Sequence, residues 1–131
     1  MLFSLAAMML LAQPEMEAAA ARPAMECSQH LTDDGARRAC LRDLMRAAQS
    51  DLEAAADSAR AEARELDLDT GGMLDATEAF GDAQSAWMRY RDAECARRSS
   101  RVMMGGAARE EISTDCRIAL SRERAQELRS Y

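Results

Sequence analysis

Apolar side chains recur every three or four positions along residues 41–66, which is the spacing of one face of an α-helix. The stripe consists of Leu41, Leu44, Ala48, Leu52, Ala55, Ala59, Ala63 and Leu66. It predicts one helix over residues 34–66, whose first turn Thr32, Asp33 or Asp34 can cap. Because only 4% of the residues are aromatic, the core has to be built mainly from Leu, Met and Ala and is thin.

Two glycine pairs divide the rest of the chain into two further helical segments. Gly71-Gly72 follows the stripe, and Gly105-Gly106 interrupts the chain again. We predict helices over residues 74–99 and 109–129. Their expected inner faces contain Phe80, Ala83, Trp87, either Tyr90 or Arg91, and Cys95 in one, and Ile112, Cys116, Ala119, Leu120 and Leu128 in the other. With six Gly, two Pro and 4% aromatic residues in 131, the chain predicts an all-α fold, a small antiparallel bundle of about three helices.

Four cysteines provide the cross-links that a small domain with a thin core usually needs. They form no C-x-x-C pair, and His30 is the single histidine, which argues against a zinc site. Four cysteines allow three pairings. An antiparallel hairpin brings Cys95, near the end of the second long helix, next to Cys116 in the third. We therefore predict a Cys95–Cys116 disulfide, which leaves Cys27 to pair with Cys40.

The first residues are typical of an export signal. Residues 2–12 form an apolar run that is too short to span a bilayer and suits a signal-peptide core. Cleavage is expected after Ala12 or within residues 18–21, so we assign residues 1–21 to a signal peptide and residues 22–131 to one domain. No basic residue precedes the run, and a buried N-terminal helix is the alternative. Disulfides persist outside the cytoplasm, so we expect a periplasmic or secreted protein. We expect no later transmembrane segment, because no later part of the sequence is apolar enough to cross a membrane.

The charge of the chain is unevenly distributed. With 23 carboxylates against 17 arginines, the composition argues against general nucleic-acid binding. Residues 51–82 hold ten carboxylates and two arginines, a net charge of −8. Residues 83–131 hold seven carboxylates and ten arginines, a net charge of +3. The acidic segment is either a solvated helix face or a docking surface for a basic partner.

The turn around the first glycine pair has the spacing of a calcium-binding loop. Acidic residues occupy positions one, three, nine and twelve of an EF-hand-like pattern, namely Asp67, Asp69, Asp75 and Glu78. Gly71 at position five offers no side-chain oxygen, and no second loop is present. The alternative is a glycine turn in which Asp75 caps the next helix and Glu78 completes a capping box. We expect no metal site, and keep a single-loop calcium-binding helical protein as an alternative.

Catalytic patterns are missing from the sequence. It contains no G-x-S-x-G, P-loop or H-E-x-x-H motif. If all four cysteines are bridged, no thiol nucleophile remains. We therefore expect neither enzymatic activity nor a cofactor.

The C-terminal half carries two patterns that occur in order. The first reads A-Q-x-x-W-x-x-Y-R-D-x-x-C over residues 83–95, and the second reads C-x-x-x-L-S-x-x-R-x-x-E-L over residues 116–128. Together with the second glycine pair, they resemble the LprI-type lysozyme-inhibitor family of small exported bacterial domains. The resemblance covers residues 80–128 and rests on Gln84, Trp87, Tyr90, Arg91, Asp92, Gly105, Gly106, Leu120, Arg124 and Leu128.

The N-terminal half shares less with that family. Cys27 and Cys40 match its early cysteine pair, and Leu52 is kept. Glu53 stands where the family usually has Asn, and alanine replaces an aromatic residue that usually follows.

The resemblance implies an exported protein that binds and blocks a lysozyme by covering its surface. The implied partner is a basic lysozyme or another envelope protein, and a non-inhibitory envelope interaction domain is the alternative. Because animal lysozymes are typically basic, an acidic docking surface predicts inhibition that weakens as salt rises. The candidate contact surfaces are the loop over residues 97–106 and the turn over residues 67–75.

The residues of the two patterns also allow a structural interpretation. We expect Trp87 and Tyr90 to lie in the core. Charge pairs between helices are expected from Arg91, Asp92, Arg124 and Glu127.

Overall fold

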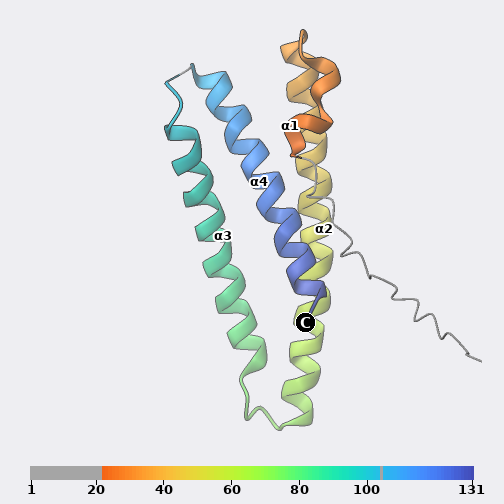
Figure 1. The fold of residues 1–131 in the computed structure, drawn as a ribbon. Helices are drawn as coiled ribbons and strands as arrows, with labels where there is room; N and C mark the ends of the chain where they lie inside the picture. The colour runs from red at the N-terminus through yellow and green to blue at the C-terminus, as the bar shows by residue number, and fades with distance from the viewer. Residues whose placement is uncertain (1–21, 104) are drawn as a thin grey trace, which may run out of the picture.

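The computed structural model describes residues 22–103 and 105–131, so the predicted signal peptide lies outside the described residues. Three long helices make up the fold, each antiparallel to the next: α2 (Asp34–Asp69), α3 (Ala76–Ser100) and α4 (Gly106–Arg129) (Figure 1). A short helix, α1 (Pro23–Glu26), and a 3₁₀ turn, η1 (Ser28–His30), come before them. The predicted all-α bundle of about three helices is confirmed.

The limits of α2 follow from one carboxylate and two glycines. Asp33 is its N-cap, because the Asp33 carboxylate accepts a hydrogen bond of 2.9 Å from the Ala36 N–H. At the other end, Gly71 and Gly72 have φ angles of 62° and 81°, and the Gly72 N–H donates to the Asp67 carbonyl at 2.7 Å. Glycine adopts this left-handed backbone without steric cost, so the predicted glycine turn ends the helix as expected.

The core consists of three small clusters rather than one large interior. Their buried members are Cys27, Leu41, Ala48 and Ile118 in the first, Leu52, Ala55 and Ala125 in the second, and Cys95, Cys116 and Leu120 in the third. Trp87 packs against the second and the third cluster and so connects α3 with both neighbouring helices.

The apolar stripe of α2 is buried over its first part only. Its residues up to Ala55 are buried or half-buried, Ala59 and Ala63 are half-buried, and Leu66 is exposed. The reason is the length of α4, which ends at Arg129 beside the middle of α2, where Arg129 forms an ion pair with Asp51. The last turns of α2 and the first turns of α3 therefore extend past α4 (Figure 1).

The buried part of α4 is broader than the predicted face. Cys116 and Leu120 are buried as expected, but the fully buried side chains include Ile118, Ser121 and Ala125, which the predicted face omitted. Because α4 packs on both α2 and α3, two sides of the helix are covered, and a single stripe does not describe them.

Both predicted disulfides are present. Cys95–Cys116 joins α3 to α4, and Cys27–Cys40 joins the residue between α1 and η1 to α2. No cysteine is free in the described part of the chain. Each disulfide therefore adds a covalent link where the apolar core is thin.

The N-terminal segment is also held by polar contacts to α4. The Ala24 N–H donates to a carboxylate oxygen of Asp115 at 2.7 Å, and Glu26 forms an ion pair with Arg122. Among the helices formed by residues 22–131, none is both long enough and apolar enough to cross a membrane.

Candidate functional site

Four family-pattern residues of α3 form its inner face. Gln84, Arg91 and Cys95 are buried, with Trp87 half-buried between them, at spacings of three and four residues. Tyr90 is 54% exposed, so the prediction that it lies in the core is wrong. The buried face follows the four-residue steps from Trp87 through Arg91 to Cys95, and Tyr90 is rotated away from it.

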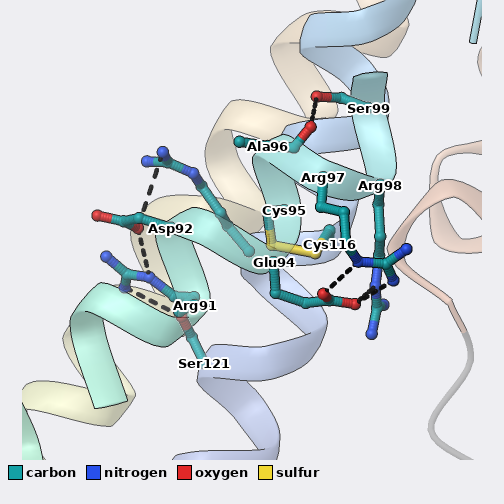
Figure 2. Close-up of a disulfide and its surroundings, with 11 residues drawn as sticks. Arg91, Asp92, Glu94, Cys95, Ala96, Arg97, Arg98, Ser99, Cys116 and Ser121 are labelled. Carbon is teal, nitrogen blue, oxygen red and sulfur yellow. Dashed lines mark hydrogen bonds and ion pairs between the residues drawn. A yellow bond between two sulfur atoms is a disulfide. The ribbon is translucent and has the colours of Figure 1, made fainter. Parts of the chain in front are cut away.

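Arg91 connects the three long helices. Its Nε donates to Asp92 Oδ1 at 3.0 Å, and its Nη1 lies 3.5 Å from Ser121 Oγ of α4 (Figure 2). The same Nη1 lies 3.5 Å from Gln49 Oε1 of α2. The guanidinium carbon lies 5.3 Å from the centroid of the Trp87 ring. A buried cation needs such partners, because an unpaired one would be costly to desolvate.

A second guanidinium lies near the same indole ring. The Cζ atom of Arg124 is 5.9 Å from the Trp87 centroid. Arg124 Nε donates to Gln84 Oε1 of α3 at 3.2 Å, and its Nη1 donates to Glu127 Oε2 at 2.7 Å. Trp87 thus lies within cation–π distance of two arginines from different helices.

The charge pairs expected between helices are formed mainly within helices. Arg91–Asp92 lies in α3 and Arg124–Glu127 lies in α4, which corrects the prediction. Arg117 of α4 approaches Asp92 across the helix interface at 3.7 Å. The buried arginines contact the neighbouring helices mostly through neutral groups, so these pattern residues position helices and offer little surface to a partner.

On the side of the Cys95–Cys116 disulfide away from Arg91, one carboxylate accepts hydrogen bonds from two arginines. Glu94 accepts from Arg97 Nε at 2.7 Å and from Arg98 Nε at 2.8 Å (Figure 2). These hydrogen bonds, with that from Arg97 the stronger influence, lower the pKa of Glu94 to about 2. The group lies near the C-terminus of α3, where cations are favourable to the helix dipole.

The acidic tip, which we define as residues 62–78, is the first candidate interaction surface. It contains six carboxylates and one arginine, a net charge of −5. Within the described residues, none of its exposed carboxylates forms an ion pair, namely Glu62, Glu65, Asp69, Asp75 and Glu78. Four apolar side chains are exposed at the same tip, namely Leu66, Leu68, Met73 and Leu74. Exposed apolar groups surrounded by charge are typical of interaction surfaces.

The carboxylate of Asp67 links the end of α2 to the start of α3 at the acidic tip. Its Oδ1 accepts from the Ala76 N–H at 2.7 Å, and its Oδ2 accepts from the Thr77 N–H at 2.9 Å. These contacts, led by hydrogen bonding with Thr77, lower the pKa of Asp67. Asp75 was expected to cap α3, but it has a φ of 48° and makes no capping hydrogen bond through its side chain. The cap comes instead from the preceding helix.

The EF-hand-like spacing does not produce a metal-ligand cluster. Both carboxylate oxygens of Asp67 accept backbone N–H groups of α3. No group of three or more His, Cys, Asp or Glu side chains is placed to hold a metal ion in the described part of the chain. The geometry at Asp67 is that of a capped helix turn.

The carboxylates in the last turn of α2 do not stabilise this helix. The C-terminus of a helix carries partial negative charge, so carboxylates in the last turn are unfavourable there. Asp67 and Asp69 occupy this turn, which has no basic residue. Hydrogen bonds to α3 offset the charge of Asp67, whereas Asp69 has no such partner. Asp69 is therefore a candidate for contact with a positively charged side chain of a binding partner.

The charge of the tip is evident from the sequence, whereas the exposed apolar side chains beside it were not predicted. Leu68, Met73 and Leu74 flank the glycine pair, with Leu68 82% and Met73 83% exposed. Leu68 lies in the last turn of α2, after the final residue of the apolar stripe, and Met73 and Leu74 lie in the turn that follows; these positions outside the stripe were the available signal.

The opposite end of the bundle carries the second candidate surface. We call residues 97–103 and 105–109 the arginine loop; it comprises the last turn of α3, the connection that follows and the first turn of α4, far from the acidic tip (Figure 1). The loop contains four arginines and no carboxylate, a net charge of +4. Arg109 Nε donates to the Val102 carbonyl at 3.0 Å, and Met103 is fully exposed.

A groove of about 530 Å³ lies at the same end, between the N-terminal segment, α2 and α4. Leu41 and Ile112 contribute to its apolar lining. Two charged residues of the lining, Arg37 and Glu111, pair with each other at 3.0 Å. Because these two charges compensate each other, they give a binding partner less net charge to recognise than the acidic tip or the arginine loop does.

Fold and surfaces together define a small three-helix domain linked by two disulfides, with the acidic tip at one end and the arginine loop at the other. The family model described as Lysozyme inhibitor LprI matches residues 27–128. The chain therefore belongs to the LprI lysozyme-inhibitor family, a family of inhibitors rather than enzymes. This match extends the resemblance over residues 80–128 to the N-terminal half and includes both disulfides. No curated protein and no solved structure gave a match.

Proposed function

We propose that this protein binds a lysozyme through the acidic tip and blocks the enzyme by covering its surface. One observation carries the proposal: in a member of a lysozyme-inhibitor family, unpaired carboxylates and exposed apolar side chains concentrate at one end. The expected partner is a basic lysozyme, because its surface potential is opposite to that of the tip.

Electrostatics favours this pairing. A net charge of −5 over residues 62–78 attracts a basic protein and speeds encounter. The Debye length is about 8 Å at physiological ionic strength, so the attraction between exposed charges is strongly screened by added salt. Salt-sensitive inhibition is therefore the expected signature.

Shape and apolar surface add to the charge. The tip projects beyond the end of α4, so it can enter a concave surface while the rest of the bundle stays clear (Figure 1). Leu68 and Met73 supply apolar contact among the carboxylates. A central apolar anchor within a polar rim is the usual anatomy of a protein interface.

We also infer that the protein acts outside the cytoplasm. Residues 1–21 have the pattern of a signal peptide, and residues 22–131 form the proposed mature domain. Two disulfides are consistent with the periplasm or the extracellular space, because such bonds persist in oxidising compartments.

A lysis assay with a basic lysozyme and the oxidised protein tests the proposal. The tip variant Glu65→Gln/Asp69→Asn/Asp75→Asn removes three exposed carboxylates. We expect its half-inhibitory concentration to rise about tenfold or more at low salt, with a smaller difference at high salt. The matched control Asp43→Asn/Glu110→Gln/Glu123→Gln removes three carboxylates outside the tip and should inhibit like the unmodified protein.

A second pair of variants tests the apolar part of the tip. Met73→Ser should weaken inhibition, whereas Met103→Ser, at the opposite end, should not. Equal losses from tip and control variants would show that the acidic tip is not the contact surface. Binding measured by calorimetry without inhibition would support the non-inhibitory interaction domain, and absence of binding would refute the proposed function.

A further inference from the structure

We propose that the arginine loop is a second docking surface, which binds the anionic surface of a lipid bilayer. This inference concerns the opposite end of the molecule and does not depend on lysozyme binding. It rests on three features of the loop, namely its charge, its exposed apolar side chain and its position in the fold.

The charge of the loop is only partly compensated. Arg97 and Arg98 share one carboxylate, Glu94. Arg101 is exposed and has no ion-pair partner within the described residues. Arg109 folds over the loop through its hydrogen bond to the Val102 carbonyl. Arg101 and Arg109 therefore form no ion pair among the described residues, and each arginine near an anionic bilayer adds to the attraction between protein and bilayer.

The apolar side chain distinguishes a bilayer from a soluble polyanion. Met103 is 100% exposed, and Arg101 lies two residues before it. A soluble polyanion would contact the guanidinium groups and gain little from this thioether. A bilayer offers headgroup phosphates to the arginines and an apolar boundary to the methionine, as in interfacial segments rich in basic and apolar residues.

The position of the loop makes such docking geometrically independent of the acidic tip. The loop joins α3 to α4 at one end of the bundle, and the Cys95–Cys116 disulfide ties these two helices together. α2 has 36 residues, which corresponds to about 54 Å of helix, and the acidic tip lies at its far end (Figure 1). Docking through the loop would direct the acidic tip away from the anionic surface, which repels it.

Vesicle co-sedimentation with the oxidised protein tests this proposal. Vesicles of phosphatidylglycerol and phosphatidylcholine provide an anionic surface, and vesicles of pure phosphatidylcholine provide the neutral control. We expect binding to the anionic vesicles at low salt, release at high salt and negligible binding to the neutral vesicles.

Four variants assign the effect to the loop. Arg101→Glu should lower the partition coefficient about tenfold, since it reverses one charge, and Met103→Ser should lower it several-fold. Arg89→Glu, an equal charge change on the exposed middle of α3, and Met73→Ser, at the acidic tip, should have much smaller effects. Circular dichroism of each variant confirms that the fold is kept.

Three results would overturn the proposal. The first is equal binding to anionic and neutral vesicles, and the second is an equal effect of Arg101→Glu and Arg89→Glu. The third is binding to soluble polyglutamate without binding to anionic vesicles, which would assign the loop to an acidic polymer. Because lysozyme is absent from the experiment, its outcome is separate from that of the proposed inhibition.

Discussion

The carboxylate of Asp67, in the last turn of α2, accepts a hydrogen bond of 2.9 Å from the backbone N–H of Thr77 in the first turn of α3. A residue of one helix thereby caps the next helix across a glycine turn. The contact sets the geometry of the acidic tip, where α4 no longer supports the other two helices.

Removal of this cap should destabilise the tip. We expect Asp67→Ala to lower Tm by roughly 3–6 °C, because the first N–H groups of α3 lose their acceptor. Faster hydrogen exchange at Ala76 and Thr77 should accompany the change. Asp69→Ala, two residues away, should leave Tm unchanged or raise it, since Asp69 opposes the dipole of α2. Equal effects of the two substitutions would argue against the cap.

The second prediction concerns the stability of the protein in acid. The pKa of Glu94 is lowered from 4.5 to about 2, so its contribution to stability is present above pH 4.5 and is lost as pH falls towards 2. Glu94→Gln should therefore lose less stability over this range than the unmodified protein. Glu26, Asp51 and Asp67 also have lowered pKa values, and they remain in both proteins. Urea unfolding at a series of pH values measures the difference, and identical pH profiles would contradict the prediction.

The third prediction separates structural from exposed residues of the family pattern. Arg91→Met should cost about 2 kcal/mol in unfolding free energy, because Gln49 and Ser121 lose a buried donor. Tyr90→Ala should change stability by less than about 0.5 kcal/mol, because Tyr90 is exposed. Chemical denaturation measures both, and lysozyme binding of the folded Arg91→Met variant should be retained. Weaker binding without lower stability would assign Arg91 to the contact surface.

Removal of one disulfide should destabilise the whole bundle, whereas removal of the other should loosen only the N-terminal segment. Cys95→Ser/Cys116→Ser should lower the unfolding free energy by about 3 kcal/mol, as the chain-entropy model gives for a closed loop of this length. Cys27→Ser/Cys40→Ser should release mainly residues 23–33 and leave the contacts between α2, α3 and α4 in place. Hydrogen exchange resolved by residue distinguishes local from global loss. Equal exchange throughout the chain in both variants would show that the N-terminal segment is integral to the bundle.

Local patterns in the sequence were sufficient for the three long helices and both disulfides, but not for α1 and η1. The stripe over residues 41–55 identifies the inner face of α2, because apolar burial follows the period of the helix. Gly71 and Gly72 mark its end, because glycine adopts positive φ at low cost. The pairing of Cys95 with Cys116 follows from the antiparallel hairpin. Each of these features depends on short-range geometry or on one hairpin.

Tertiary structure alone decided which residue of the α3 pattern is buried and how far the acidic tip is exposed. The choice of Arg91 over Tyr90 as the buried residue depends on Gln49 and Ser121, which belong to other helices. The exposure of the acidic tip depends on where α4 ends beside α2. Periodicity tells which side of a helix is apolar, but not how far along the helix a neighbour covers it. For that reason the sequence located the charge of this protein, and the packing of α4 decided which part of it stands exposed.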